Sequence, residues 1–128
     1  MRVSVVRALI GGAWLAAAMP VLTQQGPDIV EIMRQFMLAE HAAKQCLKPD
    51  QATWARFEAN RRIVTLRATE AMRKRKPGAT AWQISQWFAQ STVPVMAHMD
   101  EIIRSKGCTD PRIQDLLKRF EIQAKLSF

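Results

Sequence analysis

Two cysteines constrain this chain more than any other feature. Cys46 ends an apolar-striped segment that begins at Asp28, and Cys108 lies in a turn signal 62 residues further on. Two cysteines in a small chain that begins with an export signal are typical of one disulfide, which here would stabilise the fold by roughly 4 kcal/mol on the chain-entropy model. The alternative is two unrelated buried thiols. The sequence therefore predicts a Cys46–Cys108 disulfide in an oxidising compartment.

The start of the chain has the pattern of a secretory signal peptide. Arg2 and Arg7 form a positively charged beginning, and an uncharged apolar run follows over residues 8–22. This run covers about 15 residues, whereas a helix that spans a bilayer needs roughly 20, so a retained membrane anchor is the weaker alternative.

Small residues place the cleavage site after Ala18 or after Thr23. We expect residues 1–23 to be the signal peptide and residues 24–128, about 105 residues, to form a single domain of ordinary size. The mature protein is then expected to be periplasmic or secreted and not transmembrane once processed.

Apolar residues repeat at intervals of three and four over four segments, which is typical of amphipathic helices. Each segment follows a residue that can cap a helix, and Thr80 with Gln83 forms the best capping box. The expected helices cover residues 28–47, 50–76 and 80–106, with a fourth beginning at Asp110. The expected core stripes are Ile29, Ile32, Met33, Phe36, Ala39, Ala43 and Leu47; Trp54, Phe57, Val64, Ala68 and Met72; Ile84, Trp87, Phe88, Ser91, Val95, Met99 and Ile102; and Ile113, Leu116, Leu117, Phe120 and Ala124.

Four amphipathic helices with short loops favour an all-α four-helix up-down bundle. In that order, Cys46 and Cys108 arrive at the same end of the bundle, as a disulfide requires. Pro94 lies inside the third stripe, so the third helix is expected to be kinked or split there.

The charge is concentrated in one segment. Residues 51–76 carry eight basic and two acidic side chains, a net charge of +6 out of a total of +8. Nucleic acid would suit such a stripe, but export argues against it. An acidic or mixed protein surface is the better partner, with anionic envelope polymers or lipid headgroups as alternatives. The simplest interpretation is a solvated face whose basic end favours the helix dipole.

The second helix also has an apolar pair outside its main stripe. Ile63 and Leu66 lie roughly opposite the expected core face, beside Arg62 and Arg67. Apolar residues flanked by arginines are typical of a protein-binding surface. The alternative is a central helix that is buried on two sides.

Two charged residues fall on stripes that are expected to be buried. From the helical rise, Glu40 and Arg61 lie at similar levels on the first two helices, so we expect them to form a buried ion pair. Such a pair sets the register between helices more than it adds stability.

Methionine and histidine raise an alternative function. Met33, Met37 and His41 follow one another at intervals of four, and their thioethers and imidazole suit copper or haem. Met96 and His98 point some 160° apart on an ideal helix and are not expected to share a ligand. Methionine is more often core filler, so the leading expectation is no metal and no cofactor.

Sequence motifs for catalysis are absent. The chain contains no HExxH, GxSxG or phosphate-loop pattern, and we expect a protein that is not an enzyme.

The first helix ends in Ala43, Lys44, Gln45 and Cys46, the second helix is basic, and Lys106, Gly107 and Cys108 precede a last helix with Leu116, Leu117 and Phe120. This layout is similar to two groups of small exported helical proteins. They are the pilotins of secretin outer-membrane channels and the periplasmic immunity proteins that block the peptidoglycan-cleaving toxins of type VI secretion. Unlike lipoprotein pilotins, this leader lacks a lipid-accepting cysteine. The resemblance implies a module that binds another protein, without assigning functional residues.

These observations favour an exported, non-enzymatic α-helical protein-binding module. The expected contact surface is the helix over residues 50–76, through Arg62, Ile63, Leu66 and Arg67. The alternatives are a copper- or haem-binding bundle and an envelope stress chaperone that exposes apolar surface at low pH.

Overall fold

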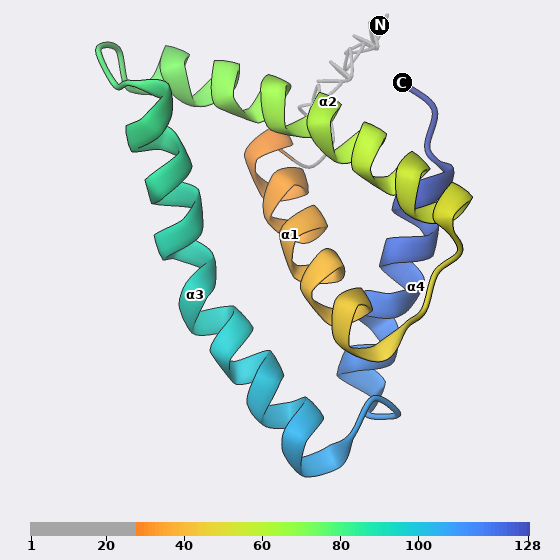
Figure 1. Cartoon of the computed structure of the whole chain (residues 1–128). Coiled ribbons are helices and arrows are strands. Elements are labelled where there is room, and N and C mark those ends of the chain that lie inside the picture. The colour runs from red at the N-terminus through yellow and green to blue at the C-terminus, as the bar shows by residue number, and fades with distance from the viewer. Residues whose placement is uncertain (1–27) are drawn as a thin grey trace, which may run out of the picture.

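The computed structural model describes residues 28–128, in which the chain forms four α-helices and no strands (Figure 1). The expected signal peptide and its cleavage site lie outside the described residues. None of the four described helices combines the length and the apolar character that crossing a membrane requires. The predicted all-α class with four helices is confirmed. The helices are α1 (Ile29–Cys46), α2 (Gln51–Arg75), α3 (Ala81–Lys106) and α4 (Pro111–Lys125).

Each helix begins beside a side chain that satisfies its free backbone donors. Asp28 Oδ1 accepts from the Val30 N–H at 3.2 Å, and Asp50 Oδ1 accepts from the Thr53 N–H at 2.6 Å. The predicted capping box forms at the start of α3, where the side chain of Thr80 and that of Gln83 each accept from the other's backbone N–H. Local capping chemistry therefore placed the helix starts correctly.

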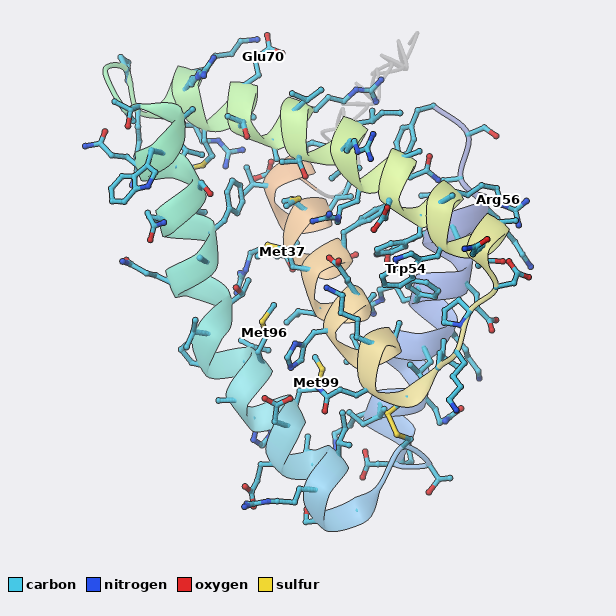
Figure 2. All side chains as sticks on the ribbon, viewed as in Figure 1. Met37, Trp54, Arg56, Glu70, Met96 and Met99 are labelled. Atoms are coloured by element: carbon cyan, nitrogen blue, oxygen red, sulfur yellow. A yellow bond between two sulfur atoms is a disulfide. The ribbon has the colours of Figure 1, made fainter. Side chains whose placement is uncertain are left out.

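The main core lies where α1, α2 and α4 meet. Phe36, Phe57 and Phe120, one from each helix, are almost fully buried. The ring centre of Phe57 lies 4.4 Å from that of Phe120 and 5.4 Å from that of Phe36, and Trp54 covers the group from the N-terminal end of α2 (Figure 2). Aromatic contacts at these separations add to the stabilisation from apolar burial.

A second buried cluster lies around the disulfide. The Cys46–Cys108 bond joins the end of α1 to the loop before α4, and the predicted disulfide is confirmed (Figure 2). This cluster connects the C-terminal half of α3 to α1 and α4. Its buried members are Ala42, Met99, Ile102, Ile113 and Leu117.

α2 lies across α1 and reaches three partners in turn (Figure 1). Its N-terminal half contacts α4, where the Asn60 side chain donates to the Gln123 carbonyl oxygen at 2.8 Å. Its middle faces α1, and its C-terminal end faces α3, where the Lys76 ammonium lies 5.6 Å from the centre of the Trp87 ring. The arrangement is thus more open than the up-down bundle expected from short loops, because α2, with 25 residues, is longer than α1 with 18 and α4 with 15, and its C-terminal end reaches α3.

α3 packs at both ends while its middle stands away from α1 (Figure 1). The helix continues through Pro94, with a visible bend, and is not split. Its buried positions are Ile84, Phe88, Thr92, Met99 and Ile102.

The expected stripe of α3 was wrong at two positions. The exposed fraction is 37% for Trp87 and 39% for Val95. The inward face continues at intervals of four from Phe88, which the expected stripe contained, to Thr92 and Met96, which it did not.

Candidate functional site

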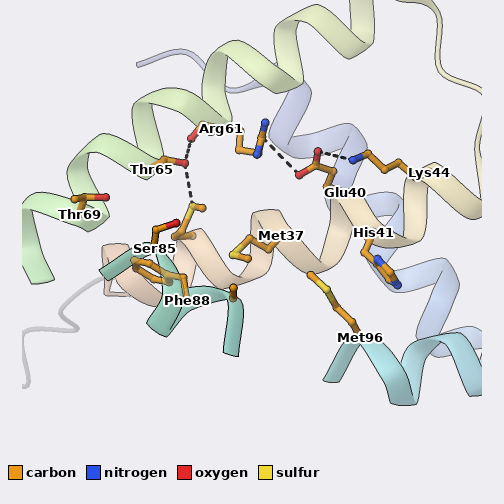
Figure 3. A pocket seen from close by; sticks show the side chains of 12 residues that line it. Met37, Glu40, His41, Lys44, Arg61, Thr65, Thr69, Ser85, Phe88 and Met96 are labelled. Atoms are coloured by element: carbon orange, nitrogen blue, oxygen red, sulfur yellow. Dashed lines mark hydrogen bonds and ion pairs between the residues drawn. The ribbon is translucent and has the colours of Figure 1, made fainter. Parts of the chain in front are cut away.

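A cleft of about 350 Å³ separates the middle of α3 from α1 and α2 (Figure 3). Its lining is mixed, with apolar side chains beside polar and charged groups that come mainly from α1 and α2. The side chains that decide its chemistry are Met37, Glu40, His41, Lys44, Arg61 and Met96. The cleft exists because α3 is held at both ends by buried clusters and bends between them.

The expected Glu40–Arg61 pair lies at one wall of this cleft. Glu40 Oε2 lies 3.6 Å from Arg61 Nε, and Glu40 Oε1 lies 3.2 Å from Lys44 Nζ (Figure 3). The Glu40 side chain is 13% exposed, whereas that of Arg61 is 36% exposed, so the arginine is only half-buried. One buried carboxylate therefore serves two cations, which fixes the level at which α2 crosses α1.

His41 is held by a carboxylate from α3. Its Nε2 lies 2.6 Å from Asp100 Oδ1, and the Gln45 amide donates to the same oxygen at 2.8 Å. Hydrogen bonds from Gln45 and His41 lower the pKa of Asp100, which therefore accepts as a carboxylate. Neutral His41 then carries its proton on Nε2 and keeps a lone pair on Nδ1. Sequence reasoning missed Asp100, because no local spacing links residues 59 positions apart.

The methionines of the cleft divide into two kinds. Met33 is buried, and its sulfur accepts a hydrogen bond from Thr65 Oγ1 at 3.2 Å. Met37 on α1 and Met96 on α3 line the cleft from opposite walls (Figure 3). His98 is exposed and does not line it.

The expected metal ligands Met33, Met37 and His41 all line this cleft. Within residues 28–128, no group of three or more His, Cys, Asp or Glu side chains is placed to hold a metal ion. Any metal site in the cleft would therefore depend on thioether sulfur.

The second candidate surface is the outer face of α2. Arg62 and Arg67 are exposed, and Leu66 is 72% exposed. Ile63 is half-buried, so Ile63 and Leu66 do not both face water.

The C-terminal residues 126–128 run over one edge of this face. Asn60 donates to the Leu126 carbonyl oxygen at 2.9 Å, and the Arg67 guanidinium lies 5.3 Å from the centre of the Phe128 ring. The tail has no periodicity from which this contact could have been predicted.

A further cleft of about 420 Å³ lies at the corner between α2 and α3. Trp82 is 70% exposed there, and Trp87 stacks under Lys76. Sequence reasoning assigned Trp87 to the core and did not consider Trp82.

The fold and these surfaces define a small disulfide-bonded all-α protein with a cleft of mixed lining and a basic helix face. No protein-family model, curated protein or solved structure matches the chain. The similarity in layout to pilotins and immunity proteins therefore stays an expectation, and the function has to be argued from the residues.

Proposed function

We propose that this chain is an exported, non-enzymatic α-helical module that binds another protein through the outer face of α2. The observation that carries the proposal is Leu66, the most exposed of the large hydrophobic side chains in residues 28–128. Exposed arginines flank it, and an apolar centre with an arginine rim is typical of a protein-binding surface.

The charge distribution indicates the kind of partner. The segment over residues 51–76 carries a net charge of +6, and the rest of the chain beyond the leader sums to zero. Such an asymmetry steers an acidic partner toward α2 and makes its association sensitive to salt. We infer a protein partner whose acidic rim surrounds an apolar pocket that accepts Leu66.

Export is supported by the disulfide. A Cys46–Cys108 bond persists where the surroundings are oxidising, as in the periplasm or outside the cell. The leader-like start of the sequence points the same way.

The test is site-specific crosslinking of the full chain, produced with its own leader in its own host. A photoreactive residue in place of Leu66 is expected to give one discrete crosslinked polypeptide. The matched control is the same residue in place of Ile122, which is 61% exposed on α4. The double charge reversal Arg62→Glu and Arg67→Glu is expected to remove the crosslink at position 66 while the helical circular dichroism is unchanged.

Equal crosslinking at positions 66 and 122 would contradict a specific surface on α2. Crosslinking that survives the charge reversal would contradict an acidic partner. Because Arg67 also contacts Phe128, the variant Phe128→Ala serves as a control for loss of the tail contact alone.

A further inference from the structure

The cleft between α1 and α3 brings together soft donor atoms that are distant in sequence. Met37 and His41 are four residues apart and share one face of α1. Met96 lines the same cleft from α3, and Figure 3 shows its side chain between Met37 and His41. The proposed contact surface lies on a different face of α2 from the one that lines this cleft. None of the three residues belongs to that surface.

The imidazole is already oriented. Asp100 holds His41 through Nε2 at 2.6 Å, and Gln45 holds the same carboxylate oxygen at 2.8 Å. Metal-binding histidines usually have such a carboxylate on the ring nitrogen that does not bind the metal, which fixes the tautomer and the ring plane. The lone pair that remains is on Nδ1.

The other donors in the cleft are already engaged. Both carboxylate oxygens of Glu40 face cations, one toward Lys44 and the other toward Arg61. Met33 is buried, and its sulfur lies 3.2 Å from Thr65 Oγ1, whose hydroxyl also donates to the Arg61 carbonyl oxygen at 2.7 Å. The sulfur and nitrogen donors that remain are two thioethers and one imidazole, beside the neutral hydroxyls of Thr65, Thr69 and Ser85. Thioethers and imidazole suit Cu(I), whereas Mg²⁺ and Ca²⁺ prefer several oxygen ligands, including carboxylates.

The charges around the cleft do not oppose a monovalent cation. Glu40 and Asp100 contribute two negative charges, and Lys44 and Arg61 contribute two positive charges, so the walls are neutral overall. We propose that this cleft binds one Cu(I) ion through Met37 Sδ, Met96 Sδ and His41 Nδ1, with Asp100 as the positioning residue.

The proposed ligands differ at one position from those expected from the sequence. Met96 replaces Met33, because the helices bring Met96 to the cleft, whereas Met33 is 6% exposed and belongs to the main core. A single ion bound from both walls would tie the middle of α3 to α1, where the fold otherwise leaves them apart. Binding to the folded state alone also stabilises it by mass action.

The first test measures Cu(I) affinity by competition with bicinchoninate, without dioxygen and with ascorbate, which leaves the disulfide intact. The processed, disulfide-bonded protein is expected to bind one Cu(I) per chain. Met37→Leu, Met96→Leu and His41→Asn are each expected to weaken binding by about tenfold or more, the scale of changes around metal ligands. Leucine conserves the side-chain volume, so the fold should tolerate these variants. His98→Asn is the matched control and is expected to bind as the unmodified protein does.

The positioning role of Asp100 has its own readout. Asp100→Asn is expected to weaken Cu(I) binding by about tenfold. It is also expected to change the His41 tautomer, which the ¹⁵N chemical shifts of the imidazole report. An unchanged tautomer with unchanged affinity would overturn this role.

A second measurement works even where a variant folds poorly, because it uses the unmodified protein. Ag(I) replaces Cu(I) as a redox-inert probe, and NMR follows the methionine methyl groups. The methyl signals of Met37 and Met96 are expected to shift with one equivalent, while those of Met72 and Met99 in the core stay unchanged.

Three results would overturn the site. They are no Cu(I) uptake in competition with bicinchoninate, an equal loss of affinity in His98→Asn, and methyl shifts confined to methionines other than Met37 and Met96. None of these results bears on the contact surface of α2, so the two proposals fail separately.

Discussion

Asn60 shows how one buried polar side chain organises two elements. It lies on the inner side of α2 with 8% of its surface exposed. Its amide donates to the carbonyl oxygens of Gln123 and Leu126, at 2.8 and 2.9 Å. The last turn of a helix leaves carbonyl groups without partners, so Asn60 supplies a C-terminal cap for α4 from another helix.

Replacing this amide should be costly. Asn60→Ala is expected to lower the free energy of unfolding by about 2 kcal/mol, because two carbonyl oxygens lose the Asn60 amide and the Gln123 oxygen keeps only the Leu126 N–H at 3.4 Å. Asn60→Asp should cost at least as much, since a carboxylate would face two carbonyl oxygens. Urea unfolding followed by circular dichroism measures both. A cost below about 0.5 kcal/mol for both variants would mean that water replaces the amide.

The lowered pKa values of three aspartates that accept hydrogen bonds determine how the stability of the fold should depend on pH. Hydrogen bonds lower the pKa of Asp100 through Gln45 and His41, that of Asp28 through Arg75 and Val30, and that of Asp50 through Thr53. The native state therefore binds protons less tightly at these sites than the unfolded state does. Their contribution is fully present above the ordinary aspartate pKa of about 3.9 and is lost as the pH falls through the lowered values.

We expect the unfolding free energy to change little through these groups between about pH 7 and pH 5 and to decrease below about pH 4. Asp100→Asn should reduce this decrease. Urea titrations at a series of pH values test the expectation, and a stability that rises on acidification would contradict it. An apolar dye added at low pH also tests the chaperone alternative.

At the scale of elements, α3 depends on its two ends. The Thr80–Gln83 capping box fixes its start, and Gly107, with φ of 79°, allows the turn after its end. Between them, Pro94 removes a backbone donor, and the Thr92 hydroxyl donates back to the carbonyl oxygens of Phe88 and Ala89 at 3.0 Å. A helix anchored in this way can bend away from α1 and leave a cleft open.

The capping box gives a prediction for this element. Thr80→Ala is expected to lower the free energy of unfolding by about 1 kcal/mol, because the Gln83 N–H loses its side-chain acceptor. Thr109→Ala is the matched control: Thr109 is also exposed and precedes a helix, but Asp110 is the residue that caps α4. Chemical denaturation compares the two variants, and equal effects would contradict the capping role.

At the scale of the whole molecule, the disulfide closes a long loop of the chain. Cys46 and Cys108 are separated by 62 positions, and their bond joins α1 to the segment between α3 and α4. The buried cluster around it is the smaller of the two cores. A small domain with divided cores gains much from such a crosslink.

Removing the bond should therefore weaken the entire fold. The double variant Cys46→Ser and Cys108→Ser is expected to lose about 4 kcal/mol of unfolding free energy, since the unfolded chain regains the entropy of a long loop. Urea denaturation of the variant and of the oxidised protein measures the difference. Adding a reductant to the variant should change nothing, whereas it should lower the midpoint of the unmodified protein. An unchanged midpoint there would contradict a structural role.

The sequence by itself determined the helices, their starts and the disulfide. Capping side chains such as Asp50 and Thr80 act within three residues, so local chemistry is sufficient to place a helix start. The cysteine pair followed from number and compartment. The Glu40–Arg61 approach was also predicted, because helical rise alone puts both residues at one level.

Only the tertiary structure decided how α2 crosses its neighbours and what the cleft contains. Asp100 reaches His41, and Met96 lines the same cleft, because α3 bends at mid-length and its inward face recurs every four residues. The tail over Arg67 likewise depends on where α4 ends against α2. Periodicity reports which face of a helix is apolar but not the angle at which two such faces meet, and that angle places residues from different helices together.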